Sequence, residues 1–173
     1  GGGSIGSELC IQIARLMPRK LVVLERSEFN LFAIERELRK DFPNLTLDIV
    51  LVDVCDSVCV EKTLKRHVPY IIFHAAAYKH VPMLETQARA AAMNNIFGTV
   101  VISRLAEKFG CKSFVLISTD KAVNPANTMG ATKRVAEMIC QHQSTLSSTK
   151  YITVRFGNVM SSSGSVIPLF QDQ

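Results

Sequence analysis

The chain opens with GGGSIGSELCIQIARLMPRKLVVLE, residues 1–25, and this stretch decides the fold. A glycine cluster comes first, followed by a segment of helical length at 4–17 and the apolar run LVVL at 21–24. Glycines let a backbone approach a pyrophosphate closely, and the positive end of the next helix favours its negative charge. The order therefore predicts a phosphate-binding loop at the start of a helix.

Apolar runs alternate with amphipathic stretches along the rest of the chain. The runs are rich in β-branched and aromatic residues, which is typical of strands. Near-continuous apolar strands alternating with helices indicate a parallel sheet covered on both faces. We therefore expect an α/β fold with a doubly wound parallel sheet, whose ligands bind beyond the carboxyl ends of the strands. Strands are expected at 21–24, 45–52, 70–73, 114–118 and 151–155, and helices at 4–17, 28–42, 57–67, 84–109 and 128–146.

Length and composition bound the possibilities. The 173 residues, 47% hydrophobic, suffice for one domain over 1–173, which we expect to be truncated at both ends because no strand precedes the glycines. The net charge of +5 is spread without a basic run, so no nucleic-acid partner is expected. The five cysteines form no CxxC pair and predict no metal site. No apolar run approaches the roughly 20 residues of a membrane span, so we expect a soluble domain. The cysteines are expected to be reduced thiols, which predicts a cytoplasmic location.

The glycines and the acidic residue at the end of the first expected strand predict a dinucleotide site. Gly1, Gly3 and Gly6 satisfy GxGxxG. Glu25 closes the next strand about 20 residues later, where a carboxylate accepts hydrogen bonds from an adenosine ribose. Because that carboxylate repels a 2′-phosphate, we expect NAD rather than NADP, a preference that Arg26 weakens.

Further residues complete this expected site. Asp53 ends the next strand and is expected to accept from the adenine amino group, unless it is the N-cap of the following helix. Three alanines follow YIIFH, where a backbone would pass close under a dinucleotide, although a buried turn is an equally good reading. The expected NAD-binding set is Gly1, Gly3, Ser4, Ile5, Gly6, Glu25, Arg26, Asp53, Val54, Ala75, Ala76 and Ala77.

Six stretches together resemble the extended short-chain dehydrogenase/reductase superfamily, and within it the polysaccharide-biosynthesis nucleotide-sugar 4,6-dehydratases. They are GGGSIGSEL, LERSEFN, FHAAAYKHVP, NNIFGT, STDKAVNPANTMGATKRVAEM and RFGNVMSSSGSVIPLF. The resemblance implies a Rossmann-like NAD domain that acts on UDP-N-acetylglucosamine in capsule or O-antigen synthesis. It also implies a strand before the glycines and a sugar-binding domain after VIPLF. In the superfamily the first glycine precedes Gly1, so the literal GxGxxG match is partly accidental.

The resemblance also places the catalytic residues. Most superfamily members use YxxxK, with tyrosine as the base and lysine on the nicotinamide ribose. This chain has Met129 and Lys133 at those positions, and methionine transfers no proton. The resemblance implies that Thr119, Asp120 and Lys121 replace the missing hydroxyl. Taken alone, the alternatives would be a helix-face Met129 and an Asp120–Lys121 ion pair at a strand end.

A 4,6-dehydratase oxidises C4 of the sugar with NAD, eliminates water across C5 and C6, and returns the hydride to C6. For the C5 proton we expect Lys121 as base, its pKa lowered by burial and by Lys133. For the C6 hydroxyl we expect Asp120 as acid, protonated because it is desolvated. Thr119 would hydrogen-bond the 4-hydroxyl. The acceptor of the 4-hydroxyl proton stays open among Lys133, the ribose and Asp120.

Other expected contacts follow from the resemblance. Lys79 and His80 follow the strand expected at 70–73 and would meet the diphosphate or sugar of a UDP-sugar, unless they form an exposed basic loop. Asn158 would contact the diphosphate, Arg155 would orient its loop, and Asn95 would be structural. A homo-oligomer is expected, with membrane association only through segments outside this chain.

Two alternative functions remain at this stage. An epimerase of the same superfamily returns hydride to C4 and has no use for an acid and a base at C5 and C6. A non-catalytic dinucleotide-binding scaffold is suggested by the missing tyrosine, and it would bind nucleotide without turnover.

Overall fold

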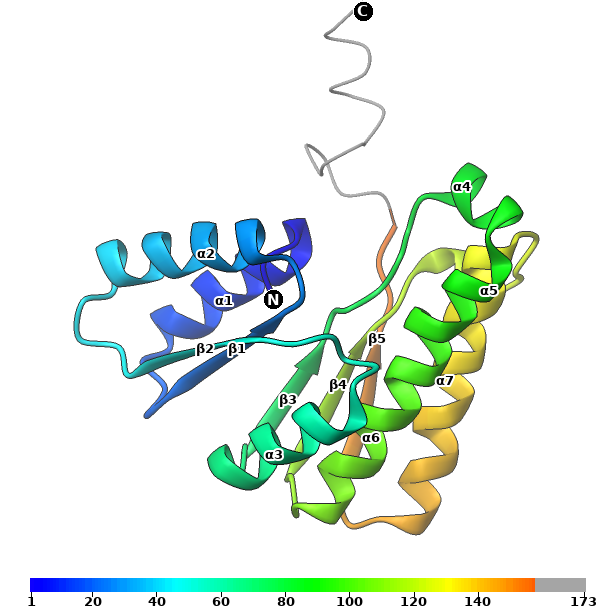
Figure 1. The fold of residues 1–173 in the computed structure, drawn as a ribbon. Helices are drawn as coiled ribbons and strands as arrows, with labels where there is room; N and C mark the ends of the chain where they lie inside the picture. The colour runs from blue at the N-terminus through cyan, green and yellow to red at the C-terminus, as the bar shows by residue number, and fades with distance from the viewer. Residues whose placement is uncertain (158–173) are drawn as a thin grey trace, which may run out of the picture.

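The structure, a computed structural model, describes residues 1–157 (Figure 1). All strand pairs in this part of the chain are parallel: β1 pairs with β2, and β4 lies between β3 and β5. Each of the five predicted strands is confirmed within a few residues. Their bounds are β1 (Leu21–Glu25), β2 (Leu47–Leu51), β3 (Ile71–His74), β4 (Ser113–Ile117) and β5 (Lys150–Val154).

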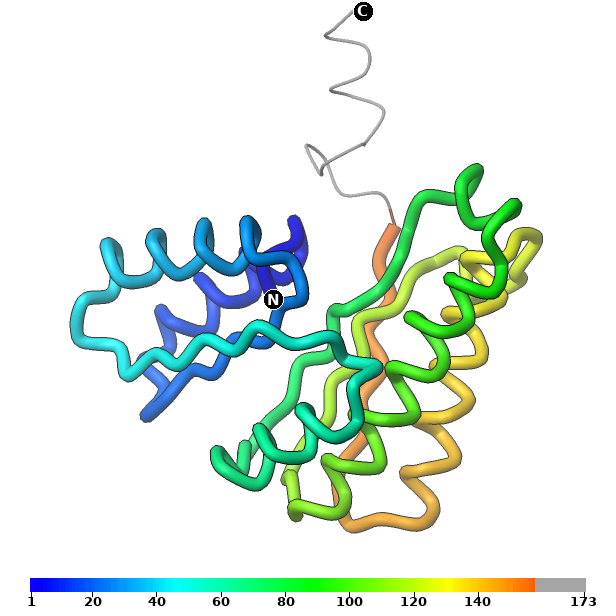
Figure 2. Tube along the Cα trace, in the orientation of Figure 1, coloured from blue at the N-terminus to red at the C-terminus, as the bar shows by residue number. Residues whose placement is uncertain are grey.

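The helices form two layers (Figure 1). Two of them pack on β1 and β2, and three others pack beside β3, β4 and β5. Figure 2 shows the chain crossing from β2 to the second layer. No helix within residues 1–157 is long and apolar enough to cross a membrane. The first layer contains α1 (Ser4–Arg15) and α2 (Glu28–Asp41), and the second α3 (Ser57–His67), α6 (Gly98–Lys108) and α7 (Thr128–Leu146).

The prediction of one continuous helix over 84–109 is wrong in detail. It is divided into α4 (Val81–Thr86), α5 (Ala88–Ala91), the π-helical segment η1 (Ala92–Phe97) and α6. A proline at the first turn lets α4 begin earlier than predicted, and the extended φ of Gln87, −127°, ends it. The wide π turn buries two asparagines, Asn94 and Asn95, which hydrogen-bond inside the protein.

Two hydrophobic cores lie on opposite faces of β1 and β2, as a doubly wound sheet requires. Val23 and Ile49 face the core formed with α1 and α2. Their neighbours Leu24 and Val50 pack against the second core, which contains Phe114 and residues of α3, α6 and α7. Within residues 1–157, β1 and β3 are not paired, so the strands form a pair and a triplet. The α/β class and the parallel arrangement are confirmed.

We predict that Phe114→Ala lowers the free energy of unfolding by about 3–5 kcal/mol, because it empties a large core site. Phe114 is fully buried, and its ring lies 5.9 Å from that of His74 and 5.3 Å from that of Tyr151, centroid to centroid. The control Phe29→Ala removes a ring that is 80% exposed and is expected to change stability by less than about 0.5 kcal/mol. Urea unfolding followed by circular dichroism measures both. Equal effects would contradict the placement of the core.

Candidate active site

The glycine loop has an open outer side. The N-cap of α1 is Gly3, which provides no side-chain cap for the first turn. A Cβ at Gly3 would meet no atom of the described residues within 4 Å, whereas a Cβ at Gly6 would collide with the carbonyl oxygen of Gly1. The loop therefore packs tightly on α1 while its backbone faces open space at the positive helix end. This arrangement fits a pyrophosphate.

Glu25 holds this loop in place. Its carboxylate accepts hydrogen bonds from the nitrogens of Gly1 and Gly2 at 2.9 and 2.8 Å, and from those of Arg26 and Ser27 at 3.0 Å. Burial alone would raise the pKa of Glu25, but the hydrogen bonds that its carboxylate accepts from the backbone of Ser27 and Gly2 lower it. A carboxylate offers about four acceptor positions, and these four donors use them. Glu25 thus anchors the loop, while its expected contact with a ribose stays a prediction.

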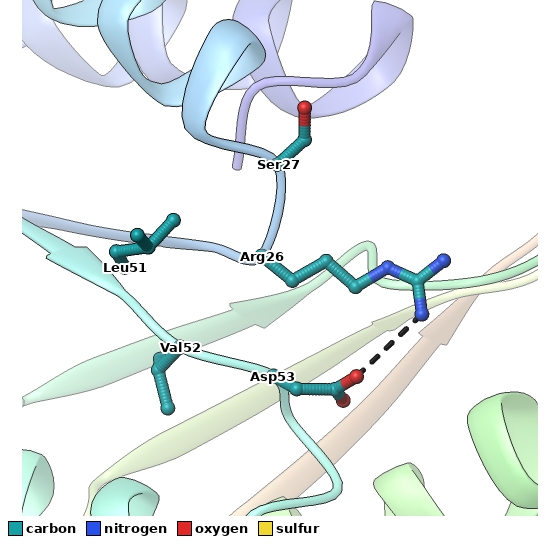
Figure 3. A pocket seen from close by; sticks show the side chains of 5 residues that line it. All are labelled: Arg26, Ser27, Leu51, Val52 and Asp53. Atoms are coloured by element: carbon teal, nitrogen blue, oxygen red, sulfur yellow. Dashed lines mark ion pairs between the residues drawn. The ribbon is translucent and has the colours of Figure 1, made fainter.

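A pocket of about 480 Å³ opens at the carboxyl ends of β1 and β2 (Figure 3). Arg26 and Asp53 point toward one another across it, with Nη1 and Oδ2 3.5 Å apart. The guanidinium of Arg26 also lies 4.5 Å from the ring centroid of Tyr78 and donates to its hydroxyl at 2.5 Å. The pocket is lined by Arg26, Ser27, Leu51, Val52 and Asp53.

The alternative role for Asp53 as a helix cap is wrong. The N-cap of α3 is Asp56, whose Oδ1 accepts from the Cys59 nitrogen at 3.0 Å. Asp53 instead accepts from the Cys55 nitrogen at 2.8 Å and keeps its other oxygen at the pocket. The next residue, Val54, packs against the second core. Gly98 lies directly against it, because a Cβ at this position would be only 2.7 Å from Val54 Cγ1.

The loop after β3 is fixed at its centre and exposed on either side. Asn95 accepts from the Tyr78 nitrogen at 2.8 Å and donates to the Tyr78 oxygen at 3.1 Å. It also donates to Thr132 on α7 at 3.0 Å, which agrees with its expected structural role. Lys79 and His80 are exposed beyond this point. The preceding alanines are half-buried at Ala75 and exposed at Ala76 and Ala77.

The structure brings Thr119, Asp120 and Lys121 together directly after β4. Thr119 Oγ1 donates to Asp120 Oδ1 at 2.9 Å, and Lys121 Nζ lies 3.1 Å from the same oxygen. The side chains of Asp120 and Lys121 are 56% and 35% exposed. We call these three residues the triad.

Two expectations about the triad are wrong for this structure. Asp120 is not desolvated, and the hydrogen bonds from Thr119 and Lys121 lower its pKa, so its carboxylate is ionised rather than protonated. Lys121 is not buried but partly exposed and ion-paired with Asp120. Sequence alone gave no measure of solvent access at this strand end.

Helix α7 supplies the buried side of the site. Lys133 is buried, its Nζ donates to the Ile117 oxygen at 2.6 Å, and burial lowers its pKa to about 8. Met129 is buried in a small cluster with Leu84 and Ala91, so it is part of the apolar interior. A Cβ at Gly130 would collide with the Lys121 oxygen, so glycine allows α7 to approach the triad closely.

Sequence reasoning missed Glu137, a buried carboxylate on α7 that binds Ser118 and Arg155. Its spacing of four residues from Lys133 was a usable signal, because it places both side chains on one helical face. The predicted contact of Asn158 lies outside the described residues.

Relatives of this chain act, by their names, in polysaccharide and nucleotide-sugar metabolism. It is 46% identical over 173 residues to the probable polysaccharide biosynthesis protein EpsC of Bacillus subtilis, covering 99% of this chain and 29% of EpsC. It is 31% identical to UDP-N-acetylglucosamine 4,6-dehydratase (inverting) of Campylobacter jejuni and to UDP-glucose 4-epimerase of Rickettsia canadensis, covering 99% and 100% of this chain. Each of these two matches covers 51% of the relative, so the chain spans about half of their length.

The fold of a solved relative is the same. The X-ray structure of Pen from Bacillus thuringiensis matches with a TM-score of 0.91 and 33% identity, over 99% of this chain and 53% of Pen. The family described as polysaccharide biosynthesis protein matches residues 1–173. The chain therefore belongs to that family, within the extended short-chain dehydrogenase/reductase superfamily.

Proposed function

We propose that this chain is the NAD-binding domain of a nucleotide-sugar 4,6-dehydratase acting on UDP-N-acetylglucosamine in polysaccharide synthesis. The observation that carries the proposal is the triad, hydrogen-bonded at the end of β4 beside a helix with methionine in the tyrosine position. An acid and a base together are what elimination across C5 and C6 needs. The domain works in the cytoplasm as part of a longer, homo-oligomeric protein that also provides a sugar-binding domain.

The residues of this chain fit NAD. The open backbone at Gly3 and the uncapped first turn of α1 would hold its pyrophosphate. Arg26 and Asp53 would line the adenosine, and Lys133 would bind the nicotinamide ribose. The ionised Glu25 beside the pocket disfavours a 2′-phosphate and hence NADP. When bound, NAD supplies the acceptor and donor of the transferred hydride.

The triad reaches its reactive form by one proton transfer. In the exposed state Asp120 is an anion paired with the Lys121 ammonium. Moving a proton from Nζ to Oδ1, across 3.1 Å, leaves a neutral amine and a carboxylic acid. Exclusion of water favours this neutral pair, because burial disfavours the charged form of both groups. Lys121 then takes the C5 proton, Asp120 protonates the leaving C6 hydroxyl, and Thr119 binds the 4-hydroxyl.

The second candidate is a nucleotide-sugar 4-epimerase. It is favoured by the relative of equal identity that is named an epimerase. That reaction restores hydrogen at C4 and leaves C5 and C6 untouched. Isotope labelling at C5 therefore separates the two candidates.

We predict that the full-length protein, incubated with UDP-N-acetylglucosamine in deuterated water, forms a UDP-4-keto-6-deoxy sugar with deuterium at C5. Deuterium enters because the C5 proton leaves to a base and is replaced from solvent. Proton NMR of the sugar measures both the product and the label. The C4 epimer alone would establish the second candidate, and unchanged substrate with bound NAD would indicate a scaffold.

We predict that Asp120→Asn and Lys121→Ala each lower product formation by at least about 100-fold, which is typical when a general acid or base is lost. NAD affinity, measured by calorimetry, is expected to stay within about twofold, because neither residue lies at the adenosine pocket. The control Lys108→Ala breaks an exposed ion pair with Glu61, remote from the triad, and is expected to leave turnover unchanged. Full turnover by either triad variant would refute the assigned roles.

A further inference from the structure

A buried carboxylate lies one helical turn beyond Lys133 on α7. The Glu137 side chain is 5% exposed, and Ser118 Oγ donates to its Oε1 at 2.6 Å. Arg155 donates to both of its oxygens, from Nε at 2.8 Å and from Nη2 at 2.6 Å, and Arg134 donates at 3.1 Å. We infer that Glu137 is a positioning residue for the triad, an inference that rests on the proposed function.

Glu137 joins three elements at one point. Ser118 directly follows β4, and Arg155 directly follows β5, so a single helical carboxylate binds the carboxyl ends of two neighbouring strands. The two parallel bonds from Arg155 fix orientation as well as distance. A buried carboxylate is stable only when it is paired, so these partners cannot drift apart without a large cost.

Backbone hydrogen bonds connect the end of β5 to the segment that contains the triad. Ser118 donates its N–H to the Val154 oxygen at 2.7 Å, and Asp120 donates to the Phe156 oxygen at 3.1 Å. These bonds extend the β4–β5 pairing beyond the end of β4. Their acceptors, Val154 and Phe156, are the residues before and after Arg155. A Cβ at Gly157 would lie 3.5 Å from Asp120 Oδ2, so this segment also passes close to the carboxylate. Releasing Arg155 would therefore loosen the backbone at Asp120.

Glu137 also acts on Lys133 through its charge. Burial would raise the pKa of Glu137, but Arg155, Ser118 and Arg134 lower it to about 2, so it is an anion at neutral pH. For Lys133, burial lowers the pKa to about 8, and Cys140 and Glu137 oppose this shift.

Besides Cys140, His74 of β3 is a titratable group that interacts with Lys133. Burial, and then the charge of Lys133, lower the pKa of His74 to about 3, so it is neutral. Removing the negative charge of Glu137 therefore lowers the pKa of Lys133 further, and no charge on His74 compensates.

The first test is Glu137→Gln in the full-length protein with UDP-N-acetylglucosamine. Glutamine keeps the size of the side chain and one acceptor but cannot pair with Arg155 as an ion. We expect kcat to fall about 10- to 100-fold, because misplacement by about 1 Å can cost about 100-fold. KM and NAD affinity are expected to stay within about twofold. The titration of Lys133 in the pH profile of kcat is expected to move to lower pH.

Two further variants serve as controls. One distinguishes the effect of the charge of Glu137 from that of its side-chain geometry, and the other tests for an effect of the same substitution at an unrelated site. Glu137→Asp keeps the charge but shortens the side chain, so it should restore the wild-type pH profile while kcat stays reduced. Glu61→Gln makes the same change at an exposed carboxylate that pairs with Lys108 at 2.6 Å, between α3 and α6. It should leave kcat and the pH profile unchanged.

Amide hydrogen exchange tests the inference without relying on the reaction. In Glu137→Gln, segment 118–123 should exchange at least about tenfold faster than in wild type, with α1 and β1 unchanged. If wild type forms no dehydrated sugar, the proposed function fails, and the exchange result still decides whether Glu137 positions this segment. Unchanged exchange at 118–123 would overturn the inference. Faster exchange throughout the chain with loss of NAD binding would also overturn it, by showing a general structural role.

Discussion

Parallel strand pairing is the constraint on which the rest of the structure depends. The register places Leu21 opposite Leu47, and Ser113 between Ile71 and Lys150, so every strand ends at the same edge of its sheet. The groups expected to do chemistry lie in the residues directly after those ends. A slip of one residue would turn each strand over, so that the side chains of one core would face the other core. The hydrophobic cores that hold this register therefore also hold the site together.

Burial divides the charged groups of the site into two kinds. Glu137 and Lys133 are buried, and each has defined partners at the end of β4. Asp120 is exposed, Lys121 is partly exposed, and the two form an ion pair. The buried groups therefore fix geometry, whereas the exposed pair can change its protonation when water is excluded. This division explains how an ionised Asp120 is compatible with a role as an acid in the proposed reaction.

The strands and the order of elements could be predicted from sequence because apolar runs and helical periodicity are local signals. The π turn around Asn95 could not, because the Asn95 side chain bonds to the distant Tyr78 and Thr132. Family resemblance identified the members of the triad, but not the exposure of Asp120, which depends on what surrounds the end of β4. The contact of Glu25 with the glycine loop was also hidden, since the spacing that predicts a ribose contact is the same for a residue that anchors the loop.

The methionine in the tyrosine position is explained by its surroundings. Met129 packs with Leu84 and Ala91, beside the half-buried Tyr78 and Val81, in an apolar cluster between α4 and α7. A tyrosine hydroxyl placed among these groups would cost free energy unless it found a partner, whereas methionine fills such a site without one. The same contact holds α4, and with it the loop that carries Lys79 and His80, against α7. In the proposed reaction, proton transfer would come from residues outside this cluster. Gly130 lets the backbone of α7 lie close to that of Lys121, because a Cβ at this position would collide with the Lys121 oxygen.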